Sequence, residues 1–246
     1  MKAIYKHLLI QFKMDLRDRG TLMVFYLIPL MFFVVMGAVF SSISPAMKST
    51  LTASMSIFAV SMGAVLGLPP TIVKMRESGT LRAYKVSGIP GNAVLLIHAL
   101  GAFLHLLVVS VIIFVAAPLF FGAGLPKNLG MYFIVLLVFL FTSITLGLLL
   151  GVAARSQAEA TMLSQVIFMP SLLLSGIMFP AAMLPKALAS LGLIFPATHA
   201  MQAFSGLAYG LKTQFDAPLA LAVIALIGVA AAVISAARFN AVGKKA

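Results

Sequence analysis

Residues 74–92 read KMRESGTLRAYKVSGIPGN, a charged segment inside a chain that is otherwise almost continuously apolar. The segment holds four basic residues and Glu77, the only acid between Asp18 and Glu159. An apolar run of more than twenty residues flanks it on each side. Each run is long enough to cross a hydrocarbon core of roughly 30 Å as a helix. Residues 74–92 are therefore predicted to form a loop in water between two membrane spans.

The spacing within this loop predicts a short amphipathic helix. Leu81 and Tyr84 lie three residues apart and share one face, while Arg82 and Lys85 lie on another. A serine and a glycine precede the helix, and glycine or proline at positions 88, 90 and 91 ends it. Such a helix at the edge of a membrane needs a surface to lie against, which is either the lipid headgroups or another protein.

The composition is that of an integral membrane protein. Hydrophobic residues make up 62% of the chain and charged residues 9%, with a mean hydropathy of +1.14, whereas charged residues make up about a quarter of soluble domains. A net charge of +12 would indicate nucleic-acid binding in a soluble domain. Because lysine and arginine also gather in the cytoplasmic loops of membrane proteins, we expect no nucleic-acid partner. The chain has no cysteine, which excludes disulfides and thiolate metal sites.

Six apolar runs are predicted to be transmembrane helices, because backbone groups in lipid must be satisfied within the segment that carries them. The runs are residues 22–43, 52–73, 93–121, 129–153, 160–179 and 217–237. No long-period repeat or low-complexity linker divides the chain. We therefore predict a single transmembrane domain, residues 1–246.

Residues 1–20 are predicted to form an amphipathic helix in the interface plane of the membrane. Their apolar residues recur at helical spacing with basic residues on the other side. The alternative is an unstructured basic tail that only sets topology. A cleavable signal peptide is not expected, because Asp15 and Asp18 precede the first apolar run.

The basic residues predict that both termini face the cytoplasm. In that orientation four basic residues fall in the outer loops: Lys48, Lys127, Lys186 and Lys212. The other thirteen fall on the inner side: Lys2, Lys6, Lys13, Arg17, Arg19, Lys74, Arg76, Arg82, Lys85, Arg155, Arg238, Lys244 and Lys245.

Residues 181–216 are predicted to form an outer re-entrant segment. They are apolar enough for a seventh span, but prolines at 180, 185 and 196 interrupt them. A seventh span would also place the basic C-terminal tail outside. We therefore expect short, broken helices that dip into the outer leaflet, where protein or water satisfies the backbone.

Glycines four residues apart indicate close helix packing, either within a subunit or between two. The pairs are Gly63 and Gly67, Gly147 and Gly151, and Gly206 and Gly210. Prolines at positions 29, 69, 70, 118 and 170 predict kinks or span ends.

Motifs for catalysis are missing from the sequence. No G-x-x-x-x-G-K-[ST] phosphate loop, H-E-x-x-H helix or G-x-S-x-G elbow occurs. No catalytic residue and no metal site is predicted, so the chain is not expected to be an enzyme. Glu159 follows Arg155 by four residues, which predicts a local ion pair.

Two histidines lie within the third predicted span. His98 and His105 are seven residues apart, on one face, and about 10 Å apart along the axis, which is too far to share one metal ion. They are either members of a proton relay or neutral side chains that face other helices or a polar cavity.

Several segments in order along the chain resemble the permease subunits of type-2 ABC exporters. These are RESGTL at 76–81, LSGIMFP at 174–180 followed by LP at 184–185, and FPATHA at 195–200. The basic amphipathic N-terminus and the six spans are similar as well. The resemblance covers nearly the whole chain.

The resemblance implies a permease without its own ATPase. Two permease copies, or one copy and a related permease, would pair in the lipid bilayer. That bilayer would be a bacterial cell membrane. Each would dock on a separate cytoplasmic nucleotide-binding subunit, which binds ATP and Mg; no cofactor is expected in this chain. The loop after the second span would be the coupling helix. Its contacts with the ATPase subunit would then come from Glu77, Gly79, Thr80, Leu81 and Tyr84.

The function implied is export of an amphipathic drug, lipid or peptide-like compound, on a path between two copies lined by the second and fifth spans. A self-contained channel or ion-coupled carrier is the alternative, which the scarcity of charge within the spans disfavours. A third hypothesis is a membrane enzyme or an immunity factor that acts by binding. An enzyme would need polar residues clustered at one depth, and outside His98 and His105 the sequence contains none.

Overall fold

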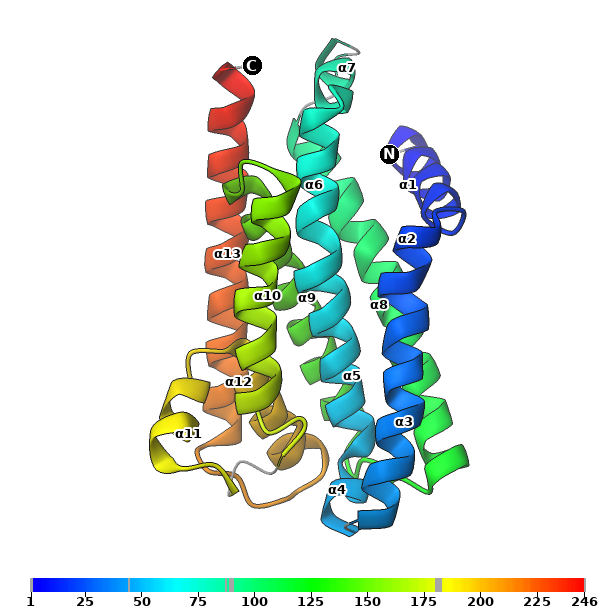
Figure 1. Ribbon diagram of the computed structural model, residues 1–246, viewed down its shortest axis with the longest axis vertical. Coiled ribbons are helices and arrows are strands. Elements are labelled where there is room, and N and C mark those ends of the chain that lie inside the picture. The colour runs from blue at the N-terminus through cyan, green and yellow to red at the C-terminus, as the bar shows by residue number, and fades with distance from the viewer. Residues whose placement is uncertain (1, 44, 87, 89–90, 180–182, 246) are drawn as a thin grey trace.

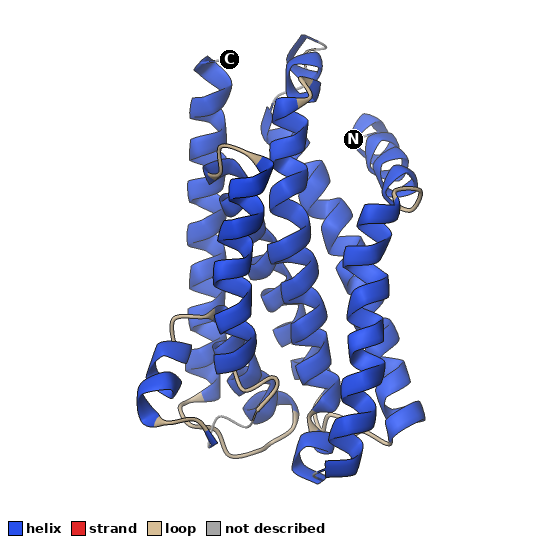
Figure 2. Cartoon of the chain, viewed as in Figure 1, coloured by secondary structure: helices blue, strands red, loops and turns tan. Residues whose placement is uncertain are grey.

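A computed structural model describes residues 2–43, 45–86, 88, 91–179 and 183–245. Within this part of the chain every regular element is helical, as Figure 2 shows. Five helices are long and apolar enough to cross a membrane, or six if a bent pair counts as one span. The predicted fold class, an all-α integral membrane protein, is confirmed. The five are Arg19–Ile43, Leu51–Glu77, Gly91–Phe121, Leu129–Ala153 and Ala217–Phe239.

Two of these spans are built from three consecutive pieces each. The first consists of α2 (Arg19–Leu22), the π-helical turn η1 (Met23–Leu27) and α3 (Ile28–Ile43). The second, which we call the central span, consists of α5 (Leu51–Ser61), η2 (Met62–Gly67) and α6 (Leu68–Glu77). Prolines follow each π-helical turn, at position 29 and at positions 69 and 70. Because proline cannot donate to the carbonyl four residues back, the wider turn takes up the break and the span continues.

The remaining elements complete a bundle of antiparallel helices with short helices at its ends. They are α1 (Lys2–Asp15), α4 (Pro45–Ser49), α7 (Thr80–Val86), α8 (Gly91–Phe121), α9 (Leu129–Ala153), α10 (Gln157–Leu174), α11 (Lys186–Gly192), α12 (Pro196–Ala203), η4 (Phe204–Ala208) and α13 (Ala217–Lys245). Helices α8 and α10 continue through Pro118 and Pro170.

The predicted fifth span, residues 160–179, is shorter than expected. Helix α10 ends at Leu174 because Gly176 takes the left-handed conformation at φ +83°. It has 18 residues. Because its sequence contains two glutamines and Glu159, it is more polar than the five long spans. Figure 1 nevertheless shows it running beside α6 through the bundle.

The spans differ widely in how much of their surface the rest of the chain covers. In the most apolar window of each, 89% of the central span is buried inside the bundle, against 22% of the first span and 28% of the last. Because a side chain in the central span touches other helices on all sides, this span is the core of the subunit.

The glycine pairs lie where helices approach the central span. A Cβ at Gly63 would meet Leu106 of α8, and one at Gly67 would lie 2.9 Å from the Phe25 ring of η1. On another side, a Cβ at Gly147 of α9 would meet the carbonyl oxygen of Ala64. The first two pairs, Gly63 with Gly67 and Gly147 with Gly151, thus lie at helix contacts within one chain.

The third pair is different. Gly206 packs against Ala217 at the start of α13, whereas Gly210 has a φ of +65° and turns the chain after η4. Its second glycine therefore serves a turn rather than a helix contact.

The two ends of the bundle carry different segments, as Figure 1 shows. Both termini, α1, α7 and the α9–α10 turn lie at one end, and α4, α11 and α12 lie at the other. The four lysines predicted to be outside all belong to segments of the second end. There the predicted re-entrant segment is confirmed as α11 followed by α12 and η4, two arms bent by 95°.

Candidate functional site

The candidate site is the tip formed by the end of α6 and by α7. The helix of the central span continues through Lys74 and Glu77, so the first residues of the predicted loop form its last turn. Cationic side chains are favourable there because the C-terminal end of a helix carries partial negative charge. Gly79 then reverses the chain at φ +74°, and Gly88 has φ +75° after α7. Two left-handed glycines therefore bracket the short helix.

Two side chains tie this tip to the α9–α10 turn. The Arg76 guanidinium donates a hydrogen bond to the carbonyl oxygen of Ala154. The Gln157 side-chain amide donates to the Glu77 carboxylate at 2.6 Å. Because Gln157 is the first residue of α10, the tip is linked directly to that helix.

The α9–α10 turn is itself held by its own side chains. Ser156 caps α10 by accepting from the backbone N–H of Glu159 at 3.2 Å. The Glu159 carboxylate accepts from the backbone N–H of Arg155 at 2.9 Å. The predicted ion pair between Arg155 and Glu159 is therefore not formed, because the carboxylate is bound by the backbone N–H of Arg155 and not by its guanidinium.

The five predicted coupling residues divide into two groups. Glu77 and Gly79 are exposed at the tip. Leu81 and Tyr84 are partly buried against the core, and the Thr80 hydroxyl is hydrogen-bonded to that of Ser78 at 2.7 Å. Leu81 and Tyr84 thus hold α7 against the bundle, so the apolar face found in the sequence faces inward.

Val86 is the outward-facing apolar residue that the sequence analysis missed. It is 85% exposed, the highest value among the large hydrophobic side chains of the described residues. At about 100° per residue it falls on the face of α7 opposite Leu81 and Tyr84, so helical spacing contained the signal.

The N-terminal helix α1 is held against α8 through His105. This ring is 1% exposed and stacks on Phe12 with centroids 4.4 Å apart. Its Nδ1 is hydrogen-bonded to the Tyr26 hydroxyl at 2.7 Å, and its Nε2 lies 3.5 Å from the Asp15 carboxylate. The predicted interfacial helix thus has a protein surface beneath it as well.

In the part of the chain that the structure describes, no three His, Asp or Glu side chains gather closely enough to hold a metal ion. His98, 9% exposed, and His105 are both buried in α8. The contacts of His105 are with aromatic and carboxylate side chains of α1 and η1.

The fold is that of a multi-span membrane protein. Its most buried span is followed by a turn and by the short helix α7 at the tip. Residues 7–209 match the family model for the ABC-2 type transporter. Since the match covers most of the chain, the chain belongs to the ABC-2 type transporter family.

A curated relative points the same way. Over 130 residues the chain is 29% identical to ABC transporter G family member 20 of Dictyostelium discoideum. The similar stretch is 53% of this chain and 18% of that relative, so the chain corresponds to a small part of the larger protein.

Proposed function

We propose that this chain is the membrane-spanning permease subunit of an ATP-driven exporter. A separate cytoplasmic nucleotide-binding subunit, carrying ATP and Mg, would supply the energy. The observation that carries the proposal is the tip, where α7 follows the central span after the turn at Gly79 and where Glu77, Gly79 and Val86 are exposed. Membership of the ABC-2 type transporter family and the name of the relative support the role of a permease subunit.

The contacts of the tip give the proposal a mechanism. The hydrogen bonds from Arg76 to Ala154 and from Gln157 to Glu77 join the end of α6 to the α9–α10 turn and to α10. Helix α7 packs on this assembly through Leu81 and Tyr84. Because the central span is packed on all sides, a displacement of α7 shifts neighbouring helices as rigid bodies. An ATPase that pushes on Val86 would thereby move the second and fifth spans.

A second permease copy is part of this proposal. Helix α10 carries an apolar stripe at intervals of four, three and four residues, the spacing of a helix-packing seam. Its members are Met162, Val166, Met169 and Leu173, which are 61%, 64%, 53% and 48% exposed. Pairing along this stripe would create a path between two copies, lined by α10. The central span is 89% buried within one copy and offers this path little surface, contrary to the expectation that the second span lines it. Its apolar character suits an amphipathic drug, lipid or peptide-like cargo.

The proposed setting is the cell membrane, with the α7 end and both termini in the cytoplasm. Because the chain lacks cysteine, single cysteines give unambiguous labels. Ser78→Cys and Lys186→Cys should react with an impermeant maleimide from opposite sides of sealed cells. Labelling of both from one side would contradict the topology.

The test of the function is a pull-down of the tagged chain from its native host in mild detergent. We expect a soluble nucleotide-binding protein in nearly equal amount, and its loss in Val86→Asp, which places a charge in the docking surface. Leu125→Asp is the matched control, since Leu125 is 64% exposed and lies in the loop between α8 and α9, at the opposite end.

Two outcomes would contradict the proposal. Absence of any ATPase from correctly inserted protein would favour the self-contained channel or carrier. Equal recovery with Val86→Asp and with the unchanged chain would remove α7 from the docking surface.

A further inference from the structure

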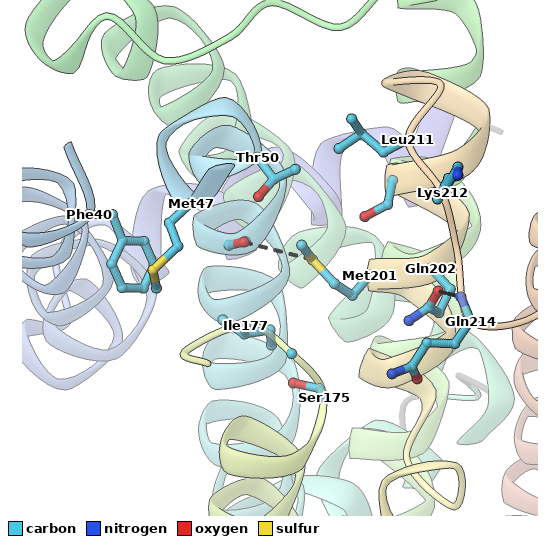
Figure 3. A pocket seen from close by; sticks show the side chains of 13 residues that line it. Phe40, Met47, Thr50, Ser175, Ile177, Met201, Gln202, Leu211, Lys212 and Gln214 are labelled. Carbon is cyan, nitrogen blue, oxygen red and sulfur yellow. Dashed lines mark hydrogen bonds between the residues drawn. The ribbon is translucent and has the colours of Figure 1, made fainter. Parts of the chain in front are cut away.

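A cavity of about 310 Å³ lies at the end of the bundle opposite α7. Figure 3 shows it between the start of α5 and the re-entrant segment. The segment that follows α10 forms one wall, and the loop after η4 forms another. Its size is at the lower end of ligand pockets, which span roughly 300 to 1,000 Å³.

The polar groups that line this cavity are rich in hydrogen-bond donors. They are the hydroxyls of Thr50, Ser54, Ser175 and Ser205, the side-chain amides of Gln202 and Gln214, and the ammonium group of Lys212. None of the described residues that line the cavity is acidic. The lining therefore complements a group that accepts hydrogen bonds and carries negative charge.

One of these donors has no partner within the described structure. Ser175 is fully buried, at 0% exposure, and its Oγ makes no hydrogen bond there. Leaving a buried hydroxyl unpaired is unfavourable, so such groups commonly mark a place where a ligand or water binds. The Ser54 hydroxyl has only a weak hydrogen-bond acceptor, the sulfur of Met201 at 3.7 Å.

Gln202 shows that the polar wall is organised. Its side-chain oxygen accepts a hydrogen bond from the backbone N–H of Gln214 at 2.9 Å, a dashed line in Figure 3. The oxygen is thus occupied by the chain itself. The amide nitrogen of Gln202 remains as a donor on the cavity side, which again favours an acceptor as the ligand.

The rest of the lining is apolar. Its members are Phe40, Met47, Ile177, Met201 and Leu211. Phe40 and Ile177 are almost completely buried, and methionine side chains adapt readily to ligands of irregular shape. An apolar body and an anionic head would thus find complementary surfaces within the same cavity.

We propose that this cavity is a binding site for a small amphipathic anion, with its head at Lys212 and the side-chain amide of Gln202 and its apolar body against Phe40 and Met201. The hydroxyl of Ser175, on the wall that follows α10, is a further donor. The site lies within a single copy of the chain, apart from the path proposed between two copies. It needs no ATPase to form.

The test uses the full chain in nanodiscs of phosphatidylcholine, a neutral lipid. The probe is dodecanoic acid carrying a diazirine group, and the comparison probe is the matching dodecylammonium ion. After illumination, mass spectrometry locates the labelled peptides, and unlabelled decanoate serves as competitor. We compare the unchanged chain, Lys212→Gln, and the control Lys186→Gln, which removes an exposed lysine of α11 at the same end.

We expect the anionic probe to label the peptides around residues 175–177 and 201–214, and the ammonium probe to label them far less. Lys212→Gln should raise the concentration of decanoate needed for competition roughly twofold to fivefold, the size expected for an exposed charge contact. Lys186→Gln should leave it unchanged. Labelling spread evenly over the lipid-facing helices, equal labelling by both probes, or equal competition in both variants would overturn the proposal.

A second competition experiment identifies the source of the anion. Displacement of the probe by phosphatidylglycerol added to the nanodisc identifies a bilayer lipid, whereas displacement by aqueous decanoate alone identifies a solute. Either outcome supports the site. Because the pull-down of the ATPase is a separate experiment, failure of the exporter proposal and failure of this one are distinguishable.

Discussion

The two ends of the central span differ in how their polar groups are used. At the α7 end, Arg76 and Glu77 are hydrogen-bonded to the α9–α10 turn. At the opposite end, the Ser175 hydroxyl is buried without a partner in the described structure, beside a cavity. A satisfied network makes a segment rigid, whereas an unsatisfied donor leaves a place for a ligand. This difference supports the proposals that one end docks the ATPase subunit and that the other binds a ligand.

The largest expected effect comes from a helix contact between the two ends, where α9 packs against the central span. In Gly147→Ala the new Cβ would meet the backbone carbonyl of Ala64, so α9 must move away from the central span. We expect a loss of about 1 to 3 kcal/mol in the free energy of unfolding. Thermal unfolding in detergent measures it. Gly130→Ala in the first turn of α9 is the control, because only the Asn128 side chain lies near the added carbon. Equal melting temperatures for the two variants would contradict the packing described.

The next effect concerns the rigid turn before α7. Gly79 has a φ of +74° and no atom within 4 Å of an added Cβ, so its substitution acts only through the backbone. Gly79→Ala should cost about 1 kcal/mol and weaken copurification of the ATPase. Gly79→Asn should weaken it less, since asparagine adopts this conformation more readily. If both variants recover the ATPase as well as the unchanged chain, the turn has no part in docking.

A smaller effect separates the ligand end from the coupling end. Ser175→Ala removes the unpaired buried hydroxyl, so the ligand-free protein should keep or gain up to about 1 kcal/mol of stability. The same variant should bind the dodecanoic acid probe more weakly and recover the ATPase normally. Clear destabilisation of the ligand-free protein would mean that Ser175 has a structural partner.

The smallest effect is electrostatic and lies at the α7 end, where α2 begins. The hydroxyl and backbone N–H of Thr21 both donate to the Asp18 carboxylate, which lowers the pKa of Asp18 below its usual value of 3.8. A lowered pKa stabilises the folded protein above the usual value, and the benefit is lost as pH falls through the lowered one. Asp18→Asn keeps the cap without titrating, so its melting temperature should fall less between about pH 5 and about pH 3. An identical fall in both proteins would contradict a role for this carboxylate.

Sequence reasoning predicted those parts of the fold that depend on local pattern. Residues 129–153 form α9 with the predicted limits, because Asn128 caps a continuous apolar run. The central span extends past the apolar run because the end of a helix tolerates charged side chains. The end of α10 was missed because it depends on the left-handed conformation of Gly176, which residue type permits but does not require.

The site was only partly predictable because its contacts join distant residues. The sequence identified Glu77 and Gly79 but gave no sign that Gln157, 80 residues away, holds Glu77. Leu81 and Tyr84 were recognised as one face of α7, yet the direction of that face depends on packing. The unpaired Ser175 hydroxyl is likewise a product of the tertiary structure.

The most direct test of the central claim is crosslinking from α7. Val86→Cys, in this cysteine-free chain, is labelled with benzophenone maleimide in native membranes and illuminated. We expect a crosslink to a nucleotide-binding subunit from Val86→Cys and none from Leu125→Cys at the opposite end. A Val86→Cys label that crosslinks only to lipid, or an ATPase captured equally from both positions, would show that α7 does not dock the ATPase.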